Sequence, residues 1–371
     1  MQEYLLMNKS RPLLSFRAEE RIAGSALVET ERFVAKDLLP PGFSDIHMWV
    51  VNRNYARYKE YMKKWIRLWG LDSETGFLNM THGLSLNDTL WVKQRDSGIG
   101  WDDVNLYHND FTDAASVIAF ADDKESRSGE DLPVTSPEFT AEGSFAKCWV
   151  REGDSIYLYK KGGYGFAGAG LEPYSECYAS QVSRRLCRTW VDYDIAAYKG
   201  SIVSRCKMFT SIEKGFVPAY KLFDMSRYCG YEEILTFCSS LGVEEDFRRM
   251  VVLDAVIFNV DRHMGNFGFI VDNDTFQILG FAPIFDHNRS LLAGAAETDF
   301  EAFDKYRQGI GHMLGGAFTD VARRLLTPAI RRDLETLSDF SFTPQAKYKF
   351  PEDRLSFLSK AVREQVRGIL A

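Results

Sequence analysis

Three residues in the second half of the chain have the types and the spacing that phosphate chemistry requires. Asp261 opens the segment 261–266 (DRHMGN), Asn266 closes it, and Asp286 follows twenty residues later. An aspartate can orient a nucleophilic hydroxyl group and accept its proton, while an asparagine and a second aspartate are hard oxygen ligands for Mg²⁺. A divalent cation would neutralise charge on a transferring phosphate. The spacing therefore predicts a phosphoryl-transfer site.

The elements around these residues favour this hypothesis over ordinary structural roles. A helix predicted over 244–258 leads the chain to Asp261. A hairpin follows Asn266, with strands predicted over 267–271 and 275–279. The hairpin returns the chain, so Asp286 can approach the first segment. Two carboxylates in one site repel each other, and a cation offsets that cost. The alternative is that Asp261 caps a turn, Arg262 makes a surface ion pair and Asp286 caps a helix.

Two segments carry a resemblance to a known family. Residues 259–266 (NVDRHMGN) and 282–286 (APIFD) resemble the signature of HipA-like serine/threonine kinases. The resemblance implies a two-lobed kinase fold with ATP as the phosphate donor. It also implies that Asp261 is the catalytic base and that Asn266 and Asp286 are the Mg²⁺ ligands.

The order of the motif leaves two alternatives open. Asp-Arg-His replaces the His-Arg-Asp order of eukaryotic protein kinases, and it also occurs in phosphoinositide kinases. A kinase of a lipid or a small-molecule alcohol is therefore one alternative. The other is a non-enzymatic regulator with a kinase-like fold that binds a DNA-binding partner. The presence of Asp261, Asn266 and Asp286 argues against such degeneration.

The resemblance also implies a strand lysine that binds the phosphates of ATP and a helix glutamate that holds the lysine. Lys160 and Lys161 end a predicted strand that starts at Ser155, and they face opposite sides because successive side chains alternate. We prefer Lys160, since a lysine at the end of an aliphatic run matches the family better, and keep Lys161 as the reserve. Glu176 on the next helix is the expected partner, and Glu172 is the second choice. Solvated surface side chains are the alternative for all four.

A loop over 135–147 (TSPEFTAEGSFAK) is the expected phosphate cradle, because backbone amides of small residues can bind phosphate oxygens. Its candidate residues are Ser136, Thr140 and Lys147. The loop departs from the glycine-rich pattern of ordinary kinases, so a plain linker has nearly equal weight.

A GxGxxG match at 163–168 does not predict a dinucleotide site. Such a site requires a helix that starts within the motif, and Gly170 and Pro173 would then fall inside the first turns of that helix. The histidines lack metal-ligand spacing. His287 is expected to neighbour the metal site, and His263 to support the catalytic loop.

The expected fold class is α+β, with a β-rich N-lobe, a helical C-lobe and an additional N-terminal α/β unit. The expected boundaries are 1–122 for the N-terminal unit, 123–132 for a polar linker, 133–210 for the N-lobe and 211–371 for the C-lobe. The family resemblance covers roughly residues 130 to 371. Further expected elements are helices over 52–69, from Pro173 and over 353–370, and strands over 146–152, 155–160, 191–196, 201–209 and 215–222.

Composition narrows the function classes. Of 371 residues, 45% are hydrophobic and 14% aromatic, which indicates a folded protein. The net charge of −7 argues against a protein whose main role is to grip nucleic acid. No apolar run is long enough for a membrane span, and six cysteines without a CxxC pair indicate reduced thiols. We therefore expect a cytoplasmic protein without a membrane or a direct nucleic-acid partner. A protein substrate and a regulatory, antitoxin-like protein are the expected partners.

Overall fold

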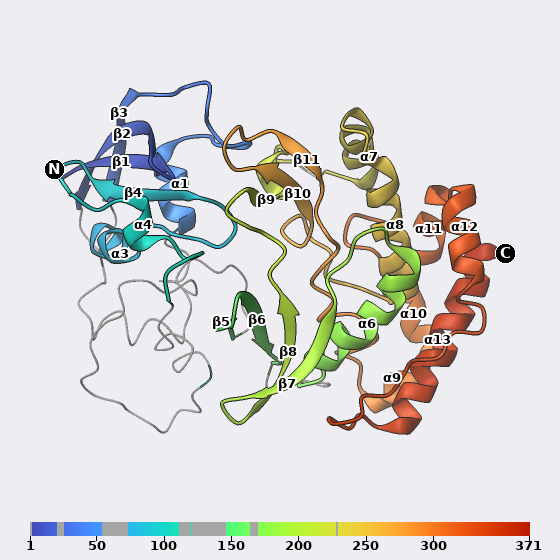
Figure 1. Ribbon diagram of the computed structural model, residues 1–371. Coiled ribbons are helices and arrows are strands. Elements are labelled where there is room, and N and C mark those ends of the chain that lie inside the picture. Colours follow the sequence, from blue (N-terminus) through green and yellow to red (C-terminus); the bar gives the residue numbers. More distant parts are fainter. Residues whose placement is uncertain are drawn as a thin grey trace. The chain divides into compact units, whose positions relative to one another are not determined.

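The structure is a computed structural model, and it divides into two compact units (Figure 1). It describes residues 2–20, 26–53, 73–110, 120, 146–163, 170–227 and 229–371. The first unit comprises Met1–Tyr159, Thr210–Val217 and Ile270–Leu279. The second unit comprises Lys160–Phe209, Pro218–Phe269 and Gly280–Ala371. The expected linker lies outside the described residues, and the expected domain boundaries stay predictions.

The first unit contains an antiparallel sheet whose strand order is β3-β2-β1-β4. Its strands are β1 (Gln2–Asn8), β2 (Arg11–Glu20), β3 (Ala26–Phe33) and β4 (Leu90–Gln94). The helices α1 (Ile46–Arg53), α3 (Glu74–Thr81) and α4 (Trp101–Val104) accompany it. The helix expected over 52–69 falls almost entirely outside the described residues.

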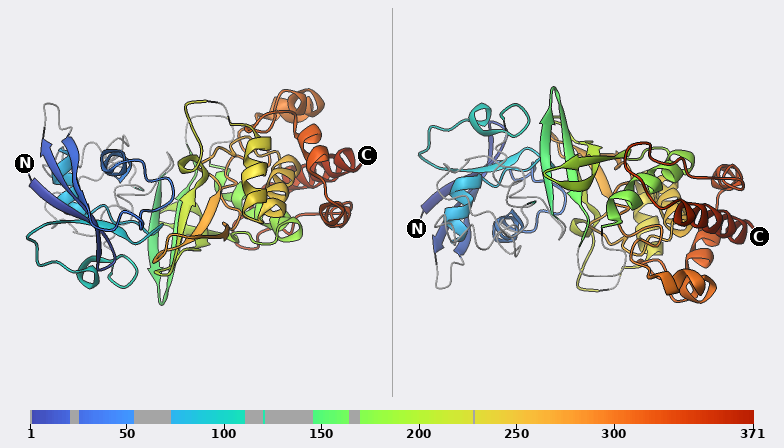
Figure 2. Two further views of the ribbon diagram at one scale, coloured as in Figure 1. Left: turned by 90° about the horizontal axis from the view of Figure 1, so that it is seen from above. Right: turned by 90° about the horizontal axis from the view of Figure 1, so that it is seen from below.

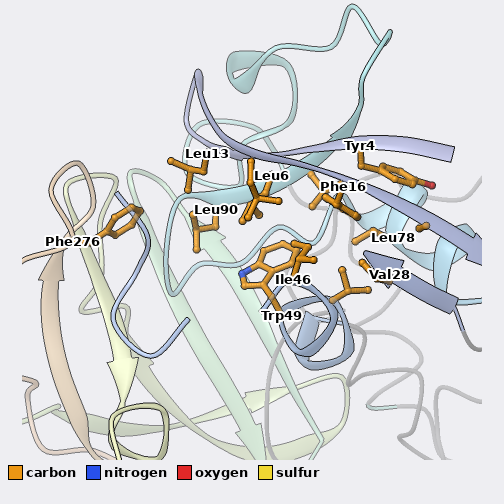
Figure 3. Close-up of a cluster of buried hydrophobic side chains, with 14 residues drawn as sticks. Tyr4, Leu6, Leu13, Phe16, Val28, Ile46, Trp49, Leu78, Leu90 and Phe276 are labelled. Atoms are coloured by element: carbon orange, nitrogen blue, oxygen red, sulfur yellow. The ribbon is translucent and has the colours of Figure 1, made fainter. Parts of the chain in front are cut away.

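Large apolar side chains from β1, β2 and α1 form the core of this unit (Figure 3). Tyr4 and Phe16 are register partners on neighbouring strands, and their rings stack with centroids 5.2 Å apart. Trp49 of α1 and Phe276 join the same cluster. Each such buried side chain contributes roughly 1.5–3 kcal/mol relative to exposure, so the sheet and helix stabilise each other.

A second sheet has the strand order β5-β6-β8-β7. Its strands are β5 (Lys147–Glu152), β6 (Ser155–Lys161), β7 (Tyr193–Tyr198) and β8 (Ser201–Lys207). The turn between β5 and β6 uses Gly153 at φ +57°, which glycine adopts without a Cβ penalty. The helix α6 (Glu172–Leu186) follows β6 and carries Pro173 in its first turn. Proline is tolerated there because the amides of the first turn have no hydrogen-bond partner within the helix.

A three-stranded sheet has the order β11-β10-β9. Its strands are β9 (Lys214–Pro218), β10 (Gly268–Asp272) and β11 (Ile278–Phe281). The expected hairpin exists, but its second strand starts at Ile278 rather than Thr275. The Asp272 side chain accepts hydrogen bonds from the amides of Asp274 and Thr275, at 2.9 and 2.8 Å, and Phe276 adopts φ +58°. These contacts extend the turn and delay the strand.

The rest of the second unit is helical (Figure 2). Its helices are η4 (Ala219–Lys221), α7 (Tyr231–Ser240), α8 (Glu244–Val256), α9 (Glu297–Glu301), α10 (Phe303–Gln308), α11 (Phe318–Leu325), α12 (Pro328–Glu335) and α13 (Glu352–Leu370). The α8 helix is buried from Met250 to Val256 and packs against α11, which also contacts α13. The expected α+β class is confirmed by this architecture. Among the described helices, none is both long and apolar enough to cross a membrane.

Candidate active site

Lys160, at the end of β6, is buried and forms two ion pairs. Its Nζ atom lies 2.8 Å from Oε1 of Glu176 on α6 and 2.5 Å from Oδ1 of Asp286. Glu176 is 1% exposed, and its second oxygen accepts a hydrogen bond from the hydroxyl of Ser204 on β8. Burial opposes the charge of Lys160, but the two carboxylates outweigh it and hold its pKa above the ordinary value. Lys160 is therefore a fixed cation.

The structure thus forms the ion pair that the sequence favoured, between Lys160 and Glu176. Glu172, the second choice, instead accepts a hydrogen bond from the amide of Gly170 at 2.9 Å. Lys161 is also buried. Lys160 is the lysine that pairs with Glu176 and Asp286, and the functional roles of both lysines stay predictions.

Asp261 lies in a short irregular segment directly after α8. The chain leaves the helix through Phe258, whose φ is +54°, and Asn259 then accepts a hydrogen bond from the Asp261 amide at 3.1 Å. Burial raises the pKa of Asp261, and the nearby Asp286 raises it further. His263 is exposed, and its Nδ1 atom accepts a hydrogen bond from the amide of Gly265 at 3.0 Å. The expected supporting role of His263 stays a prediction.

Asn266 folds back onto the same segment. Its side-chain nitrogen donates to the carbonyl of Asp261 at 2.8 Å, which fixes the orientation of the amide group. The side-chain oxygen is the atom that could bind a cation. Asn266 is 7% exposed, so this polar group is held in a largely dry environment.

Asp286 follows β11 and occupies the left-handed region at φ +59°. Its amide donates to the hydroxyl of Tyr193 on β7 at 3.0 Å. The residues before it pair with the chain after α6, since the amide of Val191 donates to the carbonyl of Ile284 at 2.9 Å. A conformation that costs an L-residue free energy is therefore held by contacts on both sides.

A buried arginine, which the sequence did not single out as a site residue, joins the two segments. Arg262 is fully buried, and one of its terminal nitrogens donates to the carbonyls of Asn266 at 2.6 Å and Phe285 at 2.5 Å. Arg262 thus contacts the backbone of Asn266, one predicted metal ligand, and the backbone of Phe285, the residue directly before Asp286, the other. The alternative of a surface ion pair for Arg262 is wrong, because its partner Asp254 is also fully buried.

Asp254 on α8 anchors this arginine. The Nε atom of Arg262 lies 2.9 Å from Oδ2 of Asp254, and the Nε2 atom of His312 lies 3.2 Å from the same oxygen. Burial alone would raise the pKa of Asp254, but the Arg262 guanidinium and His312 hold it well below its usual range. The sequence signal for this network is the position of Asp254 among the apolar residues of the helix predicted over 244–258.

His287 completes the network and is not free to bind a metal. Its Nδ1 atom lies 3.2 Å from a terminal nitrogen of Arg262, which can only donate, so Nδ1 accepts. Its Nε2 atom faces the Ser183 hydroxyl at 3.5 Å. Burial and the adjacent arginine lower the pKa of His287 to about 3. The imidazole is therefore neutral at ordinary pH.

The donor set suits Mg²⁺ rather than a metal that needs a protein cage. Within the described ranges, no three His, Cys, Asp or Glu side chains gather in a way that could hold a metal. Mg²⁺ usually takes only one or two carboxylates from the protein and the rest of its ligands from phosphates and water. The Asp286 carboxylate and the oriented Asn266 amide fit that requirement.

Two of the predicted phosphate-loop residues, Ser136 and Thr140, lie outside the described residues. Lys147 is the first residue of β5 and belongs to the first unit, whereas the groups described above belong to the second. The three assignments stay predictions.

A strand lysine paired with a helix glutamate, an Asp-x4-Asn segment after a buried helix, and an aspartate after a hairpin belong to kinase-like folds. Among solved structures, the chain resembles HipA of Shewanella oneidensis MR-1, solved as a toxin–antitoxin complex with HipB and operator DNA. The two chains share 10% sequence identity with a TM-score of 0.53, and the match covers 99% of each chain. The expected resemblance to HipA-like kinases is thereby confirmed at the level of the fold.

A second match is the proinflammatory kinase CtkA of Helicobacter pylori, at 18% identity and a TM-score of 0.45. It covers 60% of this chain and 91% of CtkA. The chain matches no protein-family model and no curated protein.

Proposed function

We propose that this chain is an ATP- and Mg²⁺-dependent kinase that transfers the γ-phosphate to a serine or threonine hydroxyl of a protein. The observation that carries the proposal is the Lys160 ammonium, which is buried and joins Glu176 to Asp286 at 2.8 and 2.5 Å. A lysine that only solubilised a strand end would not be buried against two carboxylates. The HipA-like fold supports the same conclusion.

Asp261 accepts the proton in this reaction. Its carboxylate orients the acceptor hydroxyl and takes the proton as the hydroxyl oxygen bonds to the γ-phosphorus. The bond from that phosphorus to the bridging oxygen breaks, and ADP leaves with the electron pair. The raised pKa of Asp261 makes it a stronger base than an exposed aspartate.

Lys160, Asn266 and Asp286 handle the charge on the phosphates. Lys160 donates hydrogen bonds to phosphate oxygens, and Glu176 keeps its ammonium group in place. Asn266 and Asp286 would hold Mg²⁺, which supplies neutralisation of the phosphate charge when bound. Lys160 contacts Asp286 directly, so it exchanges part of that contact for phosphate oxygens when ATP enters.

We further propose a cytoplasmic location, where ATP is available, and a regulatory protein partner. The Shewanella protein in its solved complex is bound to HipB and operator DNA. The likeness in fold across 99% of the chain supports an analogous protein partner here. The net charge of −7 does not favour direct binding to nucleic acid.

The test is to incubate the purified protein with γ-labelled ATP. Label bound to protein is then separated from label in lipid, which organic solvent extracts, and from label in other small molecules. Label bound to serine or threonine, mapped by mass spectrometry, is the expected result. Label found only in an added lipid or alcohol would instead support a kinase of a small molecule. Failure to bind Mg·ATP in calorimetry would support the non-enzymatic regulator.

A further inference from the structure

Tyr193 holds the backbone of Asp286 through its hydroxyl group. It lies on β7 and is buried, and its hydroxyl oxygen accepts a hydrogen bond from the Asp286 amide at 3.0 Å. The phosphate chemistry proposed above does not call on Tyr193.

Asp286 needs such a partner because of its conformation. At φ +59° the Cβ atom of an L-residue crowds its own backbone, so the residue stays there only when neighbours hold it. In this conformation the amide of Asp286 points to the tyrosine hydroxyl, and the carboxylate reaches Lys160 at 2.5 Å. The direction of the carboxylate therefore depends on the contact that fixes the amide.

The position of Tyr193 is fixed in turn from two sides. Cys206, whose side chain is buried, is its register partner on the neighbouring strand β8. The rings of Tyr193 and His287 meet edge to face, with centroids 6.3 Å apart.

We propose that Tyr193 is a positioning residue that holds Asp286 in its left-handed conformation and so aims its carboxylate at the cation. One part of this proposal rests on the function proposed above, namely that the cation is Mg²⁺. The hold on the backbone is a property of the nucleotide-free protein.

The substitution Tyr193→Phe removes the hydroxyl and keeps the ring that packs on His287. Tyr198→Phe is the matched control, because it makes the same chemical change at the end of the same strand, where Tyr198 is half-buried beneath Lys199. Thermal unfolding of both variants checks that they fold like the wild type.

Two quantities are then measured for the three proteins. The first is the rate of amide hydrogen exchange of residues 284–290 without nucleotide. The second is the Mg²⁺ concentration that gives half-maximal binding of ATP. We expect faster exchange at Asp286 and an increase of about tenfold in the Mg²⁺ requirement for Tyr193→Phe, since residues that orient a metal ligand typically change metal affinity by that much. Tyr198→Phe should change neither quantity.

Unchanged exchange at Asp286 together with an unchanged Mg²⁺ requirement in Tyr193→Phe would overturn the proposal. Faster exchange in a protein whose wild type binds no Mg·ATP would support the hold on the backbone and overturn the proposed function. The two failures are therefore distinguishable.

Discussion

Asp261 is the residue on which the proposed chemistry depends most directly. Replacing it by asparagine keeps its size but removes the proton acceptor. We expect Asp261→Asn to lower kcat by about 10²–10⁴-fold while binding of Mg·ATP stays within a few-fold of the wild type. Steady-state kinetics and calorimetry on the same preparation measure both. A variant with full turnover would remove Asp261 from the mechanism.

The raised pKa of Asp261 also predicts the pH dependence of the reaction. A base works only when deprotonated, so kcat/KM should fall as pH decreases through a pKa higher than the 3.8 of an ordinary aspartate. A pH profile of kcat/KM gives that value. An acid limb at or below the ordinary value would contradict the burial described for Asp261.

His287 predicts a pH dependence of stability. Its pKa falls from 6.5 to about 3 on folding, so the unfolded chain binds more protons between these two values. The free energy of unfolding should therefore decrease as pH falls from 6.5, by at most about 1.4 kcal/mol per pH unit from this group.

Urea unfolding between pH 4.5 and 7 measures this slope in wild type and in His287→Gln, with the exposed His47→Gln as the control. The slope of the unfolding free energy against pH should become shallower in His287→Gln and stay unchanged in His47→Gln. Part of the slope should remain in His287→Gln, because burial also lowers the pKa of His82. An unchanged slope in His287→Gln would contradict the lowered pKa of His287 in the folded protein.

At the scale of single residues, the sequence predicted the groups to which we assign direct chemistry and missed the buried groups that contact them. Spacing and the family resemblance pointed to Asp261, Asn266 and Asp286. Arg262 stands in the same motif, yet its burial depends on Asp254 eight residues earlier and on the carbonyl of Phe285, which only the folded chain brings together. The alternation of side chains along the strand could not choose between Lys160 and Lys161, because both of these lysines are buried. Only the family resemblance favoured Lys160.

At the scale of elements, α8 supports the site through Asp254. In Asp254→Asn, the Arg262 cation would stay buried without its counter-charge. We expect a loss of about 3–5 kcal/mol in the free energy of unfolding, the usual cost of breaking a buried ion pair from one side. Denaturant unfolding gives the value.

Asp333→Asn is the control for that experiment. Asp333 pairs with Arg249 of α8 at 2.6 Å, and the Asp333 side chain is 39% exposed. Arg249 is buried, but it keeps Glu245 as a second carboxylate partner at 3.1 Å and Asp333 is partly exposed, so the loss should be smaller, about 1 kcal/mol. Equal losses in the two variants would contradict the assignment of Asp254 as the anchor of the catalytic segment.

Helices and strands with clear periodicity could be predicted from the sequence, and turn chemistry decided the remaining details. The strands β5 to β8 and the helices α6, α8 and α13 begin or end within a few residues of the expected positions. The second strand of the hairpin was misplaced, since the Asp272 side chain binds two amides of its own turn and no periodicity reveals such a bond.

At the scale of the whole molecule, the α+β class followed from the order of strand-like and helix-like segments. The likeness to HipA over 99% of the chain extends to the first unit, for which the sequence had offered no relative. That unit has its own sheet and apolar core around Tyr4, Phe16 and Trp49. Its sequence shows no catalytic constellation.

The central claim is that the second unit transfers phosphate from ATP with Asp286 as a metal ligand. The most direct measurement is the rate of label transfer from γ-labelled ATP to protein at saturating Mg²⁺. It compares the wild type, Asp286→Asn and a control, Asp304→Asn, whose side chain is 81% exposed. The account predicts transfer by the wild type and the control and a loss of at least a hundredfold in Asp286→Asn. Equal rates in Asp286→Asn and the wild type would contradict it.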